Sequence, residues 1–298
     1  MSTQIETAWV QQYSANVMML AQQMDARLPQ TVTIDNLSAE VGYRDQVGSV
    51  DVVQRLSRHS DTPFTEVPHA RRQFTTLDWE FGEIIDKQDL QRALTNPQSS
   101  YAMAAAAAFN RRRDRTILEG IFADARTGKT GSSTVSFLSG NQIAVDYVES
   151  GSAVNSSLTI GKLRRARELL LDAEAGESDF YVVCSQRELN ALLRTVEVTS
   201  SDYNDTKALV DGKVNTFMGF DFVRVPSALL PVNGSSNRRI PAYHKSGVLF
   251  AQTGGETFQV AQDPTKGFNY RLYGSASFGA TRLEEVKCVE IICHPTTF

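Results

Sequence analysis

The chain has 298 residues and a mass of 32.9 kDa, and 41% of its residues are hydrophobic while 21% are charged. This length provides a sizeable core without disulfides or metals, and the composition argues against a disordered chain, a coiled-coil rod and a collagen-like fibre. Its 30 Lys and Arg against 34 Asp and Glu give a net charge of -4. That balance argues against a protein whose main task is to grip nucleic-acid phosphates.

The cysteines and the N-terminus indicate where the chain works. Cys184, Cys288 and Cys293 each stand among strand-like apolar residues, so we expect buried thiols in a reducing compartment rather than a disulfide framework. The first residues lack the basic and apolar regions of a signal peptide. The longest uncharged stretch, 99–110, is too short and too rich in alanine to span a bilayer. We therefore expect an intracellular chain without membrane contact.

The N-terminal residues predict an amphipathic helix that reaches residue 28 and is stopped by Pro29. Its apolar residues, among them Val10, Tyr13 and Val17, recur at three- and four-residue spacing. This stripe can pack on its own domain or on another subunit, and the pattern leaves both open. Residues 30–62 hold no long periodic run and predict a polar, weakly structured arm.

Residues 64–86 predict a long β-hairpin. Its return limb, centred on Trp79, alternates apolar and polar residues as a half-buried strand requires. Arg71 and Arg72 lie near the predicted turn. A hairpin with so few apolar residues on its first limb is not stable alone in water, so we expect it to lie on another surface. The acids of the return limb are Asp78, Glu80, Glu83 and Asp86.

A long helix is expected from Asn96-Pro97 to about Arg126. Asn96 suits the N-cap, Pro97 suits the first helical position, and Gly128 suits the C-terminal stop. At 1.5 Å per residue such a helix would measure roughly 45 Å, longer than a small domain is wide. We expect it to be the spine of the fold.

The spine helix carries a cluster of arginines that does not form one basic face. Consecutive helical residues point about 100° apart, so neighbouring arginines cannot contact one surface together. The pattern favours a solvated or interface network of salt bridges over contact with DNA. The cluster consists of Arg111, Arg112, Arg113, Asp114 and Arg115.

The second half of the chain predicts an α/β lobe followed by strands. A helix is expected over 163–173 and a strand buried on both faces at 180–184. A capping box formed by Ser185 and Glu188 opens the next helix. The further strands are predicted at 220–225, 248–251, 257–261, 269–273 and 286–293.

No catalytic residue, cofactor site or metal site is predicted, and we expect a protein that is not an enzyme. The string Gly128-Lys129-Thr130 follows a helix and lacks the earlier glycine of a phosphate-binding loop. None of the four histidines accompanies a serine flanked by glycines as a nucleophile elbow requires. The cluster of Cys288, Cys293 and His294 matches no zinc spacing, so buried thiols explain it better.

The order of these parts is informative: an N-terminal arm, a long hairpin, a spine helix, an α/β lobe and a strand-rich return. Short strings in a fixed order run through nearly the whole chain. They are Thr62-Pro63, Arg71-Arg72, Asp86-Lys87-Gln88-Asp89, Asn96-Pro97, Arg111 to Asp114, Gly161-Lys162-Leu163, Ser201-Asp202-Tyr203, Leu209-Val210-Asp211-Gly212, Phe217-Met218-Gly219-Phe220 and Gly279-Ala280-Thr281-Arg282. With these strings in this order, the chain resembles the major capsid proteins of tailed bacteriophages.

The resemblance implies an α+β fold, the Hong Kong 97-like capsid fold, in four regions. Residues 1–49 would be the N-terminal arm, and residues 50–94 would be an extended β-hairpin called the E-loop. A peripheral domain with the long spine helix and an α/β axial domain would complete the subunit. The peripheral domain would take residues 95–155 and 255–285, and the axial domain 156–254 and 286–298.

The resemblance also implies a structural function. The chain would be a major capsid protein that self-assembles into hexamers and pentamers of an icosahedral phage head enclosing double-stranded DNA. Its partners would be further copies of itself, a scaffolding protein and a portal, with cement proteins left open. Packaged DNA would be a weak, non-specific neighbour, and no cofactor or membrane is implied. The location would be the virion capsid, after assembly in the host cytoplasm.

Contacts between subunits are expected on the arm, the hairpin and the spine helix. Arginines of one subunit would face the acidic limb of a neighbour and set the register of assembly more than its affinity. The expected interface residues are Val10, Tyr13, Val17, Arg71, Arg72, Trp79, Glu80, Glu83, Arg111, Arg112 and Arg115.

Two other interpretations stay open. A bacterial encapsulin nanocompartment shares the fold but packages cargo enzymes, and the N-terminal arm and the phage-like strings weigh against it. A soluble α/β enzyme of unknown chemistry belongs to another class, and it would be monomeric at high concentration.

Overall fold

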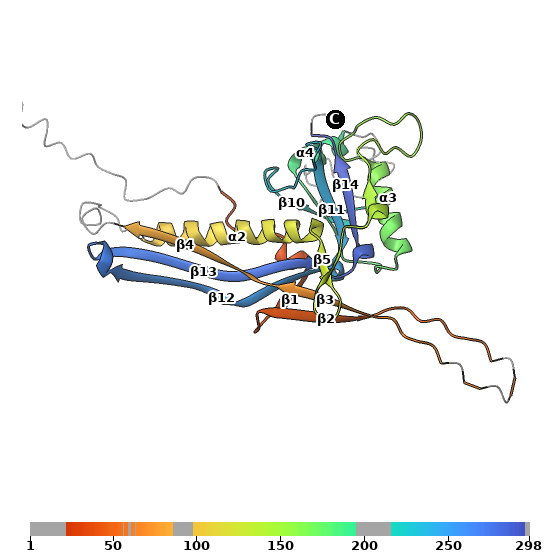
Figure 1. Ribbon diagram of the computed structural model, residues 1–298. Coiled ribbons are helices and arrows are strands. Elements are labelled where there is room, and N and C mark those ends of the chain that lie inside the picture. The colour runs from red at the N-terminus through yellow and green to blue at the C-terminus, as the bar shows by residue number, and fades with distance from the viewer. Residues whose placement is uncertain are drawn as a thin grey trace, which may run out of the picture. The chain divides into compact units, whose positions relative to one another are not determined.

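The computed structural model describes residues 22–55, 57–58, 61–62, 64–85, 98–194 and 216–295 (Figure 1). Its contacts divide the chain into two units, each made of three segments. The first unit contains Met1–Asp25, Asp78–Arg111 and Gly255–Ala276, and the second contains Ala26–Leu77, Arg112–Gly254 and Ser277–Phe298.

The predicted N-terminal helix does not reach Pro29. Residues 1–21, with Val10, Tyr13 and Val17, lie outside the described residues. From Gln22 to Leu28 the backbone is irregular, and Pro29–Thr31 forms a short 3-10 turn, η2. The expected extension to residue 28 is wrong, because the last amides before η2 donate to a side chain of α2 and not to helical carbonyls.

Residues 30–62 contain two strands that the sequence did not predict. β1 (Thr33–Asn36) pairs in parallel with the start of β12 (Val248–Asp263). β2 (Val41–Val47) pairs antiparallel with β3 (His69–Thr75). Only Gly42 of β2 is buried, so this strand lacks the apolar alternation by which a half-buried strand is recognised.

The predicted hairpin had the wrong limbs. β3 pairs with β2 on one side and with β5 (Ala125–Thr127) on the other, whereas β4 (Leu77–Ile85) lies beside β13 (Asn269–Arg282) in another sheet. Thr76 alone separates β3 from β4, too short a link to be the turn of this hairpin. The hairpin instead consists of β2, the connection 48–68 and β3.

The expected spine helix is confirmed as α2 (Gln98–Phe122), which at 25 residues is roughly 37 Å long. The predicted cap at Asn96-Pro97 lies outside the described residues. The helix ends four residues earlier than predicted, and the buried Arg282 donates to the carbonyl oxygens of Ile121 and Ala123 at that end. The guanidinium thereby satisfies carbonyl groups that a helix terminus leaves without a helical partner.

The α/β lobe is confirmed, with a six-stranded sheet in the order β7-β14-β11-β8-β10-β9. Its two helices are α3 (Ile160–Asp172) and α4 (Gln186–Leu193), and the predicted capping box of Ser185 and Glu188 opens α4. The main core cluster packs α3 and α4 against this sheet. The strands are β7 (Gln142–Ile143), β8 (Phe180–Cys184), β9 (Thr216–Phe217), β10 (Phe220–Arg224), β11 (Arg238–His244) and β14 (Cys288–Cys293).

One central strand of the lobe, β11, was missed because Pro241 lies within it, and proline argues against a central strand. β11 pairs with β14 along Arg238–Tyr243, but its described pairing with β8 begins only at Ala242. The proline therefore stands where β11 has one strand partner instead of two.

Two smaller sheets complete the fold. One has the order β1-β12-β13-β4, and the other has the order β2-β3-β5-β6, with β6 at Ser133–Val135. The predicted strands 248–251 and 257–261 form one continuous strand, β12. Gly254 lies between them with a positive φ of +64°, and the strand continues through this local irregularity. Within the described part of the chain, no helix is long and apolar enough to span a membrane.

Candidate assembly surfaces

The connection between β2 and β3 is an exposed segment with large apolar side chains. Val52 is 97% exposed and Phe64 is 96% exposed. The amide of Gly48 donates to the carbonyl oxygen of Pro68 and closes the base of the loop, and beyond that point the two limbs separate (Figure 1). Exposed apolar side chains gathered on one loop are typical of surfaces that bind other molecules. The exposed apolar residues of this loop also include Val50, Val53 and Val67.

Arg71 lies in the paired base of the hairpin. It stands opposite Asp45 in the register of β2 and β3, and its Nε donates to Asp45 Oδ1 at 2.5 Å. This hydrogen bond lowers the pKa of the Asp45 carboxyl below its ordinary value. Both side chains are exposed, so Arg71 remains available to a second partner.

Arg72 was predicted at an interface, but the structure gives it a buried intramolecular role. Its Nη2 donates to both carboxylate oxygens of Glu285 at 2.8 and 2.9 Å, and its Nε donates to the carbonyl oxygen of Leu283. The side chain is only 5% exposed. A guanidinium buried and engaged in this way contributes to the stability of its own chain, and its predicted contact with a neighbouring subunit stays a prediction.

The spine arginines make separate contacts, as the helical geometry predicted. Arg111 donates to the side-chain oxygen of Gln22 at 2.8 Å and to the carbonyl oxygen of Gln23. Arg112 forms an ion pair with Glu119 at 3.0 Å. Arg115 is exposed. Of the three, Arg115 is the most accessible to another molecule.

The predicted acidic limb is strand β4. Trp79 is half-buried, and Glu83 is exposed. Glu80 accepts a hydrogen bond from the Tyr273 hydroxyl at 2.9 Å, which joins β4 to β13 within the first unit. Glu80 therefore already has a partner in its own chain, while Glu83 is free to face solvent or a neighbour.

Asp114 holds the residues that precede β1, a role that the sequence did not reveal. It is fully buried, and its carboxylate accepts hydrogen bonds from the amides of Arg27 and Leu28 at 3.0 to 3.1 Å. Three residues after Leu28, the Thr31 hydroxyl shares a hydrogen bond of 2.6 Å with the Tyr243 hydroxyl. We call residues 27–31 the arm root. No local pattern could predict these contacts, because Asp114 lies more than eighty residues from its partners.

Lys162 is buried in the α/β lobe and has only backbone acceptors. Its ammonium donates to the carbonyl oxygens of Val145, Ser156, Ser157 and Ile292 at 2.9 to 3.2 Å. Burial lowers the pKa of this ammonium. The side chain thus connects the loop before α3 to β14, the strand of this sheet that comes last in the chain.

The three predicted thiols are free and buried. Burial raises the pKa of Cys288 and Cys293 to about 12 and raises that of Cys184 as well. Since the thiolate is the reactive form, we expect none of them to react with iodoacetamide in the folded protein at mildly alkaline pH. Mass spectrometry should find all three alkylated after unfolding. Alkylation of any thiol under native conditions would contradict the structure.

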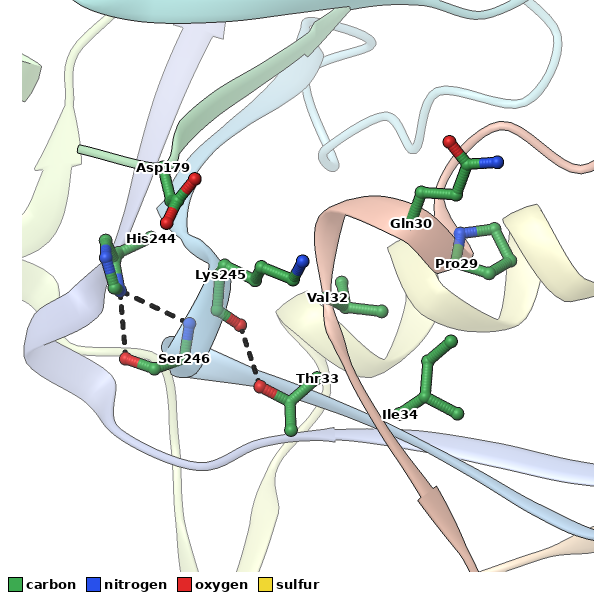
Figure 2. Close-up of a pocket in the computed structure, with 9 residues that line it drawn as sticks. All are labelled: Pro29, Gln30, Val32, Thr33, Ile34, Asp179, His244, Lys245 and Ser246. Atoms are coloured by element: carbon green, nitrogen blue, oxygen red, sulfur yellow. Dashed lines mark hydrogen bonds between the residues drawn. The ribbon is translucent and has the colours of Figure 1, made fainter.

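A hollow of about 640 Å³ lies beside β1 within the second unit (Figure 2). His244 borders it, and its Nδ1 accepts from the Ser246 amide at 3.2 Å, so the imidazole caps the 3-10 turn Lys245–Gly247. Burial and the charge of Lys287 lower the pKa of His244. Among the described residues, no group of three His, Cys, Asp or Glu could hold a metal ion. The hollow is lined by Pro29, Gln30, Val32, Thr33, Ile34, Asp179, His244, Lys245 and Ser246.

Solved structures of phage capsids share the fold. The capsid structure of the cyanophage P-SCSP1u aligns with a TM-score of 0.76 at 14% identity, covering 99% of this chain and 95% of that chain. The capsid of Ralstonia phage GP4 aligns with a TM-score of 0.71 at 9% identity, covering 97% of both chains. The cyanophage Pam1 capsid aligns with a TM-score of 0.70 at 10% identity, covering 98% and 97%. These likenesses confirm the expected α+β capsid fold.

The sequence itself carries the family assignment. No curated protein matches the chain. A family model described as phage capsid protein matches residues 5–294, nearly the whole length. The family and the fold point to a structural protein of the virion capsid rather than to an enzyme. On this match, the chain belongs to the phage capsid protein family.

Proposed function

We propose that the chain is a major capsid protein whose copies form the hexamers and pentamers of an icosahedral head around double-stranded DNA. The observation that carries this proposal is the exposed apolar connection 48–68. A soluble monomer rarely leaves side chains such as Val52 and Phe64 almost fully exposed on one loop. Contact with a neighbouring copy would remove them from water, and repetition of that contact around a closed symmetry axis would build a capsomer.

The proposed regions follow the strand pairing. The E-loop is best defined as residues 41–75, because β2 and β3 form its paired base. The arm then comprises the residues before β2, the peripheral domain is built on α2, and the axial domain is the α/β lobe. Interface contacts are proposed for the arm residues Val10, Tyr13 and Val17, and for Arg71, Trp79, Glu80, Glu83, Arg111, Arg112 and Arg115.

The charge of the chain fits a container wall. A net charge of -4 limits non-specific attraction to the packaged DNA, which would be a weak neighbour of the inner surface. Further partners would be a scaffolding protein and a portal, met during assembly in the host cytoplasm. Electron microscopy of purified particles, scored for tails and DNA against protein cargo, would separate a phage head from an encapsulin.

Replacing both Val52 and Phe64 with aspartate should prevent assembly. Burial of a valine or phenylalanine side chain contributes about 1.5–3 kcal/mol, so losing two such contacts should reduce the assembled fraction at least about tenfold. Sedimentation and negative-stain electron microscopy measure that fraction. Val154→Asp is the matched control, because Val154 is also an exposed loop valine but lies before α3.

The outcome is decisive in either direction. The control should assemble like the natural chain, and circular dichroism should show that the double variant remains folded. Particles of normal yield from the double variant would contradict the role of the connection. A natural chain that stays monomeric at high concentration would contradict the shell function itself.

A further inference from the structure

We propose that the open edge of β1 binds the segment Val50–Val53 of a second copy, which adds to the sheet as an extra strand. This inference rests on the proposed function and deepens it, because it names the surface on which the exposed loop of one copy docks. The site on the receiving copy is the hollow beside β1 (Figure 2).

The receiving edge is the backbone edge of an outer strand. β1 is the outer strand of the sheet β1-β12-β13-β4, and in the part of the chain that the structure describes its strand partner is β12 alone. An outer strand presents a row of backbone N–H and C=O groups that can pair with another chain. Proteins usually blunt such edges with proline, lysine or a bulge. The sequence of β1, TIDN, contains neither proline nor lysine, and its one charged side chain, Asp35, is paired with Arg44 of the same chain.

The hollow offers one exposed apolar side chain next to that edge, Ile34. The buried Val32 also lines the hollow on the side of β1, and Figure 2 shows Lys245 across from Val32. Ile34 is 49% exposed although it belongs to a strand. A strand laid along β1 would cover this side chain and continue the backbone ladder, which is how extended peptides bind exposed sheet edges.

The segment Val50–Val53 has the sequence of a strand without forming one. Its three valines are β-branched and suit a pleated surface, yet the segment has no strand partner among the described residues. Val50, Val52 and Val53 are 43%, 97% and 64% exposed. In an extended backbone Val50 and Val52 point to the same face, so both can pack beside the exposed side chain of Ile34.

The charges fit a protein segment better than a polyanion. The hollow combines one carboxylate, Asp179, with one ammonium, Lys245, and this pair does not attract phosphates as a basic cluster would. The segment and its flank also carry one charge of each sign, Asp51 and Arg55. Since successive residues extend about 3.3 Å each, Val52 can lie roughly 17 Å beyond Val47, clear of the paired base of its own hairpin.

A disulfide between copies tests this contact. The double variant Ile34→Cys with Val52→Cys places a thiol on each partner, and the native thiols are buried and do not compete. After mild oxidation of assembled particles, non-reducing denaturing electrophoresis should show at least tenfold more covalent multimer than either single variant. The matched control combines Val52→Cys with Leu171→Cys, because Leu171 is exposed to a similar degree as Ile34 but lies on α3.

Hydrogen exchange of the natural chain provides a second test that needs no substitution. Amides of Thr33–Asn36 and of Val50–Val53 should exchange at least tenfold more slowly in particles than in unassembled subunits. Particles that form normally but show neither this protection nor the specific disulfide would overturn the docking site and leave the shell function intact. Cross-linking equal to that of the Leu171 control would also overturn it. A chain that forms no particles would overturn the proposed function first.

Discussion

Replacing Lys162 with methionine should lower the free energy of unfolding by about 3 kcal/mol or more. Methionine fills a similar volume but donates no hydrogen bond, so the carbonyl oxygens of Val145, Ser156, Ser157 and Ile292 would lose their buried donor. Each buried polar group left without a partner costs about 1–3 kcal/mol. Urea denaturation of the unassembled subunit measures the change.

The control for this variant is Lys129→Met, at an exposed lysine that follows β5. A substitution of that kind usually changes stability by less than about 0.5 kcal/mol. Equal stability of the two variants would show that the four carbonyl contacts do not support the lobe.

The difference in stability between the natural chain and Lys162→Met should also depend on pH. Burial lowers the pKa of Lys162 in the folded state below the value of 10.5 for a free lysine. Between the folded and the free pKa, the unfolded chain therefore binds more protons, and stability due to this group rises with pH. The stability advantage of the natural chain over Lys162→Met should grow as the pH rises towards 10.5. A shrinking difference would contradict the lowered pKa.

Replacing Asp114 with alanine should release the arm root and cost about 3 kcal/mol. The carboxylate accepts from the buried amide of Leu28 and the part-buried amide of Arg27, and a hydrogen bond to a charged group contributes about 1.5–3 kcal/mol. Denaturation measures the loss of stability. Trypsin adds a local measurement, because the peptide bond after Arg27 should be cut at least tenfold faster once the amides of Arg27 and Leu28 are released.

Asp114→Asn is the matched variant, since it keeps one side-chain oxygen that can accept. It should lose less stability than Asp114→Ala and should be cut at an intermediate rate. Faster cleavage of the alanine variant with unchanged global stability would locate the effect at the arm root alone. An unchanged cleavage rate at Arg27 would refute the anchoring role of Asp114.

Elements with a strong local signal could be predicted from residues close together in the chain. The length and alanine content of α2 and the capping box of Ser185 and Glu188 depend on positions within a few turns of helix. The run of apolar residues in β8 is likewise a local feature of a buried strand. The same kind of reasoning excluded a single basic face for the spine arginines.

Strand partners could not be predicted in this way. β3 and β4 are separated by Thr76 alone, and the sequence offered no reason to pair β3 with β2 across the 48–68 connection. β2 and β11 were missed because one has almost no buried side chain and the other contains Pro241. Their stability comes from backbone pairing with strands that are remote in sequence, which no local pattern records.

The candidate site shows the same division. The sequence by itself determined the family, the spine helix, the lobe and the buried thiols, because these depend on composition, short-range periodicity and the order of motifs. Only the tertiary structure decided that Arg72 is buried against Glu285 and that Asp114 holds the arm root. It also showed that, within the described part of the chain, Val50–Val53 has no strand partner and β1 pairs on one side only. The physical reason is that burial and pairing depend on contacts between residues tens to hundreds of positions apart, which only the folded chain brings together.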